Sequence, residues 1–550
     1  MKDIAEFFRI QGKRFCAFIL MVLICLTITV CDLFKEVIPD PLSYDEAVKK
    51  VTFTGDVATV DFTNLYGHNI YLVKINASNN NIPAANTGGS AQVLPAISLE
   101  EDVEGTRLLK DGLHSYHLKK LEMSANPPPI DMEARSGAGM AANSVSYSIG
   151  SKRNFWVERN LSLNNSGGNW VNRQATLMAS GEYGNIWVAD SNTPSGTSNN
   201  RISTERVEEL CRRFDLIYPL ATNLLGYEYG GGPGGNGGMD GDKKIQILVY
   251  DFYEPGYVPT GISYAGFFSP TDFYTQDEID RWGWGDKTNL AEIFYVNART
   301  AIYSPDYIYS LLIHEFQHMI NFNRKYVEQK VNANSWYNEM LSMMAEDVIA
   351  PLIGIGRNNN NHPTQVRIPK FLDSYYQSGI TEWVGSDNNY EKAYAFGAYL
   401  MRNYGGPELL MRILDNQRVN IDSLTLAIKG FSVDMDFYKA LARYGEAMIF
   451  SGSSMPEDTV NGIGVVSFDK TVTSTINGQE YTAYGFDIWQ TRRSGTNERG
   501  PLVLNIEPVS MRPHSVVIQS IDEWQNKTGN FSITLERPSN QNVVVYLMAR

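Results

Sequence analysis

The sequence predicts an α+β protein in which a mixed-sheet domain with buried helices is flanked by N- and C-terminal β-sandwich-like domains. At 550 residues, the chain exceeds the ~250–300 residues at which one hydrophobic core stops growing, so several domains are expected. Aromatic residues make up 12% of the chain, which is typical of packed sheets. Alternating strand patterns occupy both ends of the chain, whereas long helical patterns lie in the middle.

Composition and charge exclude several classes of protein. Hydrophobic residues make up 43% and charged residues 20%, close to ordinary globular averages, so wholesale disorder is excluded. The formal net charge of −14 repels phosphate backbones and acidic lipid surfaces. We therefore expect no nucleic acid partner.

The first 31 residues have the layout of a secretory signal. Basic residues within 1–14 precede an uncharged apolar run over 15–30, which is shorter than the ~20 residues needed to span a bilayer. Cys31 follows directly, where bacterial lipoproteins carry an acylated cysteine. We expect export from a bacterial cell, as an envelope lipoprotein anchored through Cys31 or as a secreted protein. An uncleaved signal anchor is the alternative, and membrane contact is expected only through this segment.

Four further segments follow the signal. Short alternating runs over 45–122 predict an N-terminal β domain, and the proline-rich stretch 123–143 predicts a linker. Residues 144–458 combine strands with long amphipathic helices and form the predicted central domain. Residues 459–550, with an Asn-Gly hairpin turn at Asn477, predict a C-terminal β domain.

A glycine-rich loop over 230–241 raises the question of phosphate or calcium binding. A P-loop is excluded because the following lysines, Lys243 and Lys244, lack the Gly-Lys-Ser/Thr arrangement and no helix pattern begins there. Asp240 and Asp242 are candidate ligands for a calcium ion, Ca²⁺, and a solvated turn is the alternative interpretation.

The most informative segment is a predicted buried helix over 304–323. His314 and His318 stand four residues apart, so both imidazoles project from one face and can bind one metal ion. Glu315 lies between them, in the H-E-x-x-H pattern whose carboxylate takes a proton from water at a Zn²⁺ ion. Such a pattern is expected by chance only roughly 0.01 times in this composition. Two histidines merely packed within a helix are the alternative.

A hydrolytic zinc site needs a third protein ligand and an open position. A second helix is predicted over 335–349, and it presents Glu339 in its first turns, 21 positions beyond His318. Glu339 is the predicted third ligand. A metzincin site is excluded because Asn321 and Arg324 stand where that class has Gly and His.

These motifs resemble the gluzincins, in which H-E-x-x-H is followed by N-E-x-x-S/A, here Asn338, Glu339 and Ser342. The runs HEFQHMINF and WYNEMLS resemble those of the hyicolysin-like family of bacterial neutral metallopeptidases, over roughly residues 150–450. The resemblance implies a thermolysin-like zincin catalytic domain. It also implies His314, His318 and Glu339 as zinc ligands and Glu315 as catalytic acid/base.

One position departs from the thermolysin-like pattern. Members of that group carry an Asp four residues after the third ligand, where it orients a zinc histidine, whereas this chain has Met343. Glu346, nearly one turn farther along, is the candidate replacement. An ordinary solvated carboxylate is the alternative interpretation of Glu346.

Peptide hydrolysis also needs an oxyanion donor and a means of holding the substrate. The helical run 388–406 resembles the tyrosine-bearing helix of several gluzincins, which makes Tyr394 or Tyr390 a catalytic candidate. A packed aromatic residue is the alternative for either one. Residues 261–272 are a candidate edge strand to which a peptide substrate adds itself, and a plain sheet edge is the alternative.

Together these patterns predict an exported zinc-dependent endopeptidase that hydrolyses peptide bonds of proteins or peptides by metal-activated water. The competing hypothesis is a surface adhesin or binding lipoprotein with an inactive peptidase-like scaffold. A metal-dependent hydrolase acting on another bond is a third, weaker possibility.

Overall fold

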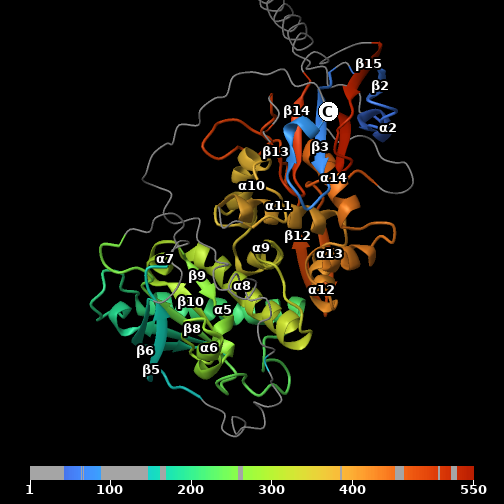
Figure 1. The fold of residues 1–550 in the computed structure, drawn as a ribbon. Coiled ribbons are helices and arrows are strands. Elements are labelled where there is room, and N and C mark those ends of the chain that lie inside the picture. Colours follow the sequence, from blue (N-terminus) through green and yellow to red (C-terminus); the bar gives the residue numbers. More distant parts are fainter. Residues whose placement is uncertain are drawn as a thin grey trace, which may run out of the picture.

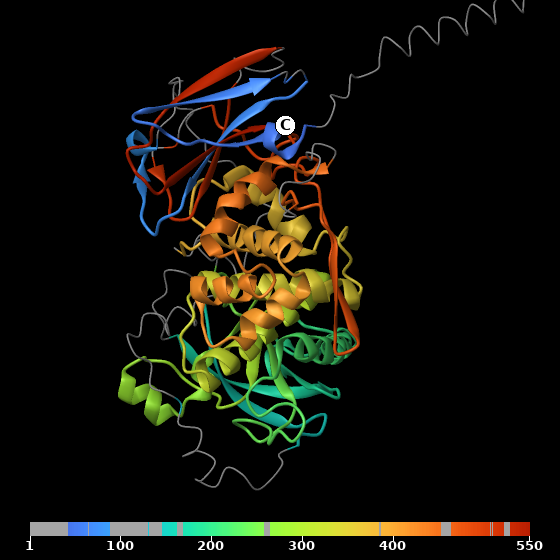
Figure 2. The ribbon, with the colours of Figure 1, turned by 90° about the vertical axis from the view of Figure 1, so that its right-hand side faces the viewer.

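A computed structural model describes residues 42–63, 65, 67–87, 130, 146–161, 169–257, 264–383, 387–452, 464–505, 508, 510–521 and 529–550. Of residues 387 and 388 it describes the backbone alone. The described chain forms three parts stacked along one direction, with a mixed sheet at one end, helices in the middle and a β part at the other end (Figures 1 and 2). This arrangement confirms the predicted α+β class with a mixed sheet.

The mixed sheet has six strands in the order β5-β6-β7-β8-β10-β9. Strands β5, β6 and β7 run antiparallel, β7, β8 and β10 are parallel, and β9 returns antiparallel at the edge. The strand bounds are β5 Lys152–Glu158, β6 Trp170–Ser180, β7 Gly184–Ala189, β8 Ile245–Tyr250, β9 Gly266–Phe268 and β10 Ile293–Asn297.

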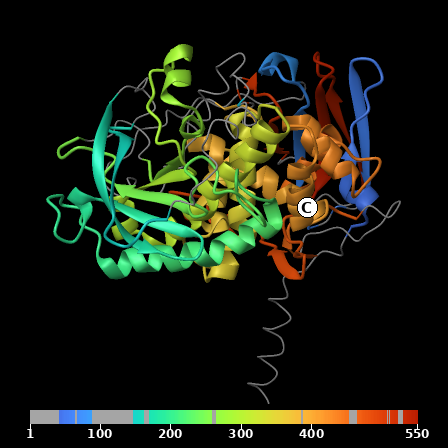
Figure 3. The same cartoon turned by 90° about the horizontal axis from the view of Figure 1, so that it is seen from below.

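Alternation along the strands gives this sheet two buried faces. On β7, Ile186 and Val188 join the main core with the helices, whereas Trp187 and Ala189 face a second core on the opposite side. Helix α5, Thr204–Leu225, runs along the first face (Figure 3). It approaches closely because Gly184 leaves room for the Phe214 ring, which a Cβ at that position would meet at 2.7 Å.

The helical part surrounds two almost completely buried helices, α8 (Pro305–Asn321) and α9 (Ser335–Ile349). Helix α8 packs between α5 and α9, and α9 packs in turn against α11. The remaining helices are α2 Tyr44–Ala47, η1 Ala84–Asn86, η2 Asp190–Asn192, η3 Pro270–Phe273, α6 Gln276–Trp282, α7 Ala298–Tyr303, the π-helix η4 Phe322–Glu328, η5 Ala350–Ile353, α10 Pro363–Ser374, α11 Asp387–Asn403, α12 Pro407–Asp415, α13 Asn420–Lys429 and α14 Phe437–Ile449.

The π-helix η4 continues α8 and fixes its end to the rest of the helical part. The buried Lys325 donates to the carbonyl oxygens of Ile413, at 2.8 Å, and of Asn416. Gln329 donates to the Leu414 carbonyl at 3.3 Å. These carbonyls form the C-terminal end of α12, where a cation and N–H donors are favoured. The end of α8 therefore cannot shift without breaking this anchor.

The β part is assembled from both ends of the chain. Its sheet has the order β1-β16-β3-β14, and β15 pairs with β2 and β13 with β4. N- and C-terminal strands thus alternate in one sheet, which differs from the two separate flanking β domains predicted from sequence. The bounds are β1 Val48–Lys50, β2 Val57–Thr63, β3 Ile70–Asn76, β4 Ile82–Pro83, β13 Ser510–Met511, β14 Val516–Ser520, β15 Asn530–Glu536 and β16 Val543–Ala549.

A separate hairpin, β11 (Val472–Ile476) with β12 (Gln479–Ala483), packs on the helices rather than on the β part. Its tip is the predicted turn, with positive φ at Asn477 and Gly478. The side chain of Asn223 donates to the Ile476 carbonyl at 2.8 Å, and the Tyr481 hydroxyl donates to the Leu220 carbonyl at 2.7 Å. Both contacts attach the hairpin to α5.

Several sequence predictions fall outside the described residues. These include the signal segment with Cys31 and, apart from Ile130, the linker 123–143. Within the part of the chain that is described, no helix has the length and apolar character required to cross a membrane.

Because β16 pairs with β3 in one sheet, a destabilising substitution in β16 should also destabilise the N-terminal strand β3. Leu547 on β16 is fully buried opposite Leu72 of β3, so Leu547→Ala should lower the free energy of unfolding by ~2–5 kcal/mol. Hydrogen exchange should accelerate at the β3 amides as well as in β16. The exposed Glu536→Ala should change neither quantity measurably. Unchanged protection of β3 in Leu547→Ala would contradict the shared sheet.

Candidate metal centre

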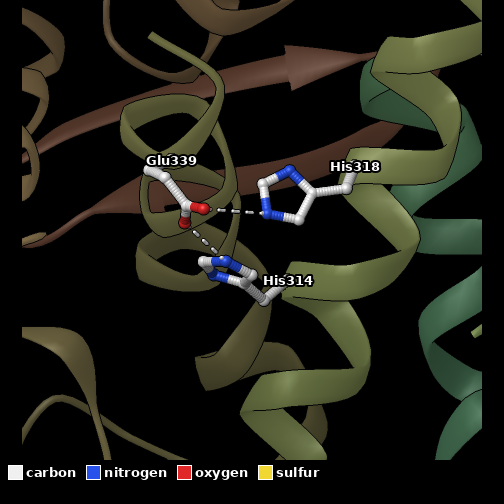
Figure 4. A group of neighbouring side chains, drawn as sticks. All are labelled: His314, His318 and Glu339. Carbon is white, nitrogen blue, oxygen red and sulfur yellow. Dashed lines mark hydrogen bonds and ion pairs between the residues drawn. The ribbon is translucent and has the colours of Figure 1, made fainter. Parts of the chain in front are cut away.

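Helix α8 presents His314 and His318 on one face, as their spacing predicts. Their ring centroids lie 4.7 Å apart, and both rings are 0–1% exposed. Glu339 approaches from α9, with one carboxylate oxygen 3.0 Å from His314 Nε2 and the other 3.6 Å from His318 Nε2 (Figure 4). The structure therefore brings the three predicted ligand residues together, with one donor atom from each within 4.8 Å of the others.

The donor set fits a divalent metal ion. His318 Nε2 and the facing Glu339 oxygen are both buried, and neither makes a hydrogen bond to any described residue. Orphaned buried polar atoms are costly, and two such atoms facing each other indicate that a cation belongs between them. Two imidazole nitrogens and one carboxylate oxygen form the ligand set typical of catalytic zinc, which leaves a fourth position open.

Glu346 supports the first histidine. It lies two turns beyond Glu339 on α9, is 3% exposed, and accepts a hydrogen bond from His314 Nδ1 at 2.7 Å. Its other oxygen accepts from the Ser310 hydroxyl at 2.6 Å. The carboxylate thus holds the His314 proton on Nδ1 and leaves Nε2 facing the centre. Of the two interpretations of Glu346, the buried orienting carboxylate is correct, and Met343 is a buried core residue.

The second histidine has a different support that sequence reasoning missed. His318 Nδ1 lies 3.1 Å from the Ser342 hydroxyl, and that hydroxyl also hydrogen-bonds the side-chain oxygen of Gln317. Asn338, the neighbour of Glu339, instead accepts a hydrogen bond from Asn321 at the end of α8. Ser342 stands one turn from Glu339 on the same helix face, a spacing that is visible in the sequence.

The charges at the centre polarise one another strongly. Burial disfavours a charged His314, but its hydrogen bonds to Glu339 and Glu346 outweigh burial and raise the pKa of His314 to about 10. Burial alone would raise the pKa of Glu339, yet the neighbouring His318 and His314 lower it to about 2. For His318, burial is the largest effect and lowers the pKa. Glu339 is therefore ionised and ready to neutralise a cation.

Glu315 lies next to the two histidines without a partner of its own. Both carboxylate oxygens are buried and accept no hydrogen bond of normal geometry from any described residue. Burial raises the pKa of Glu315 to about 8, partly opposed by His314 and by the Phe268 backbone. Phe268 belongs to β9, so Glu315 lies close to the edge strand of the mixed sheet. A carboxylate with a pKa near neutrality suits proton transfer.

Tyr394 is fully buried on α11, the helix that packs against α9. Burial, and then the nearby carboxylate of Asp347, hold the pKa of Tyr394 well above its usual range. Asp347 makes a buried two-pronged ion pair with Arg402, at 2.8 and 3.2 Å. This pair faces α11 on a different side of α9 from Glu339 and Glu346. The oxyanion role of Tyr394 stays a prediction: its hydroxyl is buried and makes no hydrogen bond of normal geometry to any described residue.

The glycine-rich loop does not form an open calcium cage. Asp240 accepts from the Asp242 amide at 3.0 Å and from Arg153 at 3.2 Å, and Asp242 accepts from the Lys244 amide at 3.1 Å and from Asn185 at 2.7 Å. All four carboxylate oxygens thus have protein donors. Among the described residues, the cluster of His314, His318 and Glu339 alone has metal-binding spacing.

Residues 164–471, more than half of the chain, match the model of the family described as Peptidase M30. The chain belongs to the peptidase M30 family. It is also 26% identical over 266 residues to the Neutral metalloprotease ShpI of Staphylococcus hyicus, a match that covers 46% of this chain and 53% of that protein. The match thus spans about half the length of the relative. The matched region of this M30 chain contains α8 and α9, so the resemblance predicted from HEFQHMINF and WYNEMLS is confirmed at the level of the family.

The contact between Glu346 and His314 predicts a measurable loss of metal affinity in Glu346→Gln. Replacing the carboxylate by an amide removes the charge that makes His314 a better ligand. We expect the zinc dissociation constant, measured by competition with a chelator, to rise about 10–100-fold. Glu208→Gln, on the exposed face of α5, is the matched control and should bind zinc like the unaltered protein. Equal zinc affinities of the two variants would show that Glu346 does not support metal binding.

Proposed function

We propose that this chain is an exported zinc endopeptidase in which His314, His318 and Glu339 hold the metal ion and Glu315 is the catalytic acid/base. The observation that carries the proposal is a buried carboxylate, Glu315, next to three converging ligand groups, of which His318 Nε2 and one Glu339 oxygen have no hydrogen-bond partner among the described residues. Membership of the peptidase M30 family supports peptide bonds as the substrate class.

Glu315 performs the proton transfers. A zinc ion bound by the three ligands would supply Lewis-acid chemistry to water and to the scissile carbonyl. Glu315 takes a proton from the attacking water and returns it to the leaving amine, a role that its raised pKa favours. Neither of its oxygens accepts a hydrogen bond of normal geometry from a described residue, so both are available for this transfer.

Strand β9 is the proposed binding edge for the substrate backbone. It is the last strand of the sheet, with β10 on one side and no strand pairing on the other among the described residues. Its residue Phe268 lies close enough to Glu315 for its backbone to lower the pKa of that carboxylate. A peptide added along β9 therefore lies with one of its bonds beside the catalytic group.

Tyr390 and Arg367 are the proposed donors to substrate carbonyl oxygens. Arg367 on α10 is 6% exposed. It lies 5.6 Å from the centre of the Tyr390 ring. Burial disfavours its charge, and the charges of Glu346 and Glu391 compensate and raise the pKa of Arg367. Arg367 thus lies near Glu346, the carboxylate that contacts His314.

Export and anchoring rest on the N-terminal sequence. The basic residues and apolar run before Cys31 support a signal, with Cys31 lipidated or the mature protein secreted. The alternative function, a surface adhesin or binding lipoprotein, rests on the β part and would leave the metal centre idle. The intact ligand set and the M30 family favour the peptidase.

Glu315→Gln should separate metal binding from catalysis. The substitution preserves shape but removes the proton acceptor, so kcat for casein hydrolysis should fall at least ~10²–10⁴-fold. Bound zinc, measured by elemental analysis, should remain near that of the unaltered protein because Glu315 is not a ligand. Glu208→Gln should retain full activity. Substantial activity in purified Glu315→Gln would overturn the assignment, and zinc-loaded but inactive unaltered protein would favour the binding function.

The two tyrosines of α11 provide a matched pair of variants. Tyr390→Phe should lower kcat about 10²-fold, because it deletes a donor to the developing oxyanion. Tyr394→Phe should leave kcat of the folded enzyme nearly unchanged and change the free energy of unfolding by no more than ~1 kcal/mol, because its buried hydroxyl makes no hydrogen bond of normal geometry to a described residue. Peptidase assays and thermal unfolding of both variants test this. The reverse pattern would identify Tyr394 as the oxyanion donor.

A further inference from the structure

Gln317 occupies the last variable position of the H-E-x-x-H motif, directly before His318. It is completely buried, and its side-chain oxygen accepts a hydrogen bond from the Ser342 hydroxyl on α9. Its side-chain nitrogen makes no hydrogen bond to any described residue. Burying a primary amide whose nitrogen is unpaired costs free energy of folding, so the contact of its oxygen with Ser342 calls for an explanation.

With the Gln317 amide oxygen facing Ser342, the hydrogen bonds at Ser342 have one consistent direction. A serine hydroxyl has a single proton, and Gln317 Oε1 can only accept, so Ser342 must donate to Gln317. The Ser342 oxygen, 3.1 Å from His318 Nδ1, must then accept a hydrogen bond from the N–H group at that nitrogen. A neutral His318 therefore carries its proton on Nδ1 and has a lone pair on Nε2. Nε2 is the atom that lies 3.6 Å from Glu339 in the metal centre.

We propose that Gln317 and Ser342 act as a positioning pair that fixes the ligand tautomer of His318. The inference rests on the proposed zinc site and concerns residues outside it. The pair makes the two metal histidines unequal, because His314 is held by the anionic Glu346 and His318 by a neutral hydroxyl–amide chain. Asn338 is not available for this role, since it is already hydrogen-bonded to Asn321.

The direction of the hydrogen bonds from His318 through Ser342 to Gln317 explains why an acceptor is needed at position 317. Without an acceptor at position 317, the Ser342 proton has His318 Nδ1 as its nearest acceptor. The hydroxyl would then donate to Nδ1, the imidazole proton would move to Nε2, and the atom needed by the metal ion would be blocked. An acceptor of any charge at position 317 restores the original direction.

The test compares Gln317→Met, which removes the acceptor at similar volume, with Gln317→Glu, which keeps it. Two readouts are required: the zinc dissociation constant from chelator competition, and the tautomer of His318 in the metal-free protein from imidazole ¹⁵N chemical shifts. We expect Gln317→Met to weaken zinc binding about 10–100-fold and to move the His318 proton to Nε2. Gln317→Glu should keep the proton on Nδ1 and bind zinc at least as tightly as the unaltered protein.

Controls separate this inference from packing damage and from the zinc site itself. Met343→Leu changes a buried side chain next to Ser342 and should alter neither readout. Ser342→Ala should also weaken zinc binding, which keeps the inference testable if Gln317→Met does not fold. If Glu339→Ala binds zinc normally, the proposed metal site is wrong. If Glu339→Ala loses zinc but Gln317→Met and Ser342→Ala retain normal affinity and tautomer, the site stands and the positioning pair is wrong.

Discussion

The metal centre depends on a buried carboxylate placed between two imidazoles on a neighbouring helix. Glu339 lies 3.0 Å from His314 and 3.6 Å from His318, and all three side chains are buried. Such a group is stable only if the helices hold their register, because a shift of one residue would rotate the carboxylate out of the cluster. The rest of the helical part supplies that register.

Polar contacts between α8 and α9 fix this register along the whole length of their interface. Ser310 and His314 bond Glu346 near one end, Gln317 and His318 bond Ser342 in the middle, and Asn321 bonds Asn338 at the other end. Beyond Asn321, Lys325 anchors the continuing π-helix to the end of α12. Buried polar networks of this kind specify one arrangement where an apolar interface would accept several.

Local patterns were sufficient to predict that His314, His318 and Glu339 come together, but not all of their surroundings. The four-residue spacing of His314 and His318 fixes a common face, and the chain after His318 is long enough to return a second helix with Glu339. The role of Glu346 remained open because burial, which sets it apart from a solvated carboxylate, depends on packing. The role of Tyr394 stays a prediction, because helical periodicity does not reveal which groups a helix face meets, and here one of them is Asp347.

The β part was the least predictable feature. Its strands alternate correctly, yet β3 pairs with β16 although they lie at opposite ends of the chain. A period of two residues identifies the buried face of each strand and contains no information about its partner. Two terminal β segments therefore suggested two domains, whereas hydrogen bonding unites them.

The most direct test of the account is a crystal structure of the zinc-loaded protein with anomalous diffraction data collected at the zinc absorption edge. The account predicts one anomalous peak bonded to Nε2 of His314, Nε2 of His318 and the carboxylate of Glu339, at about 2.0–2.2 Å, with an open position beside Glu315. A peak coordinated by other residues, or no peak at these three side chains, would contradict it.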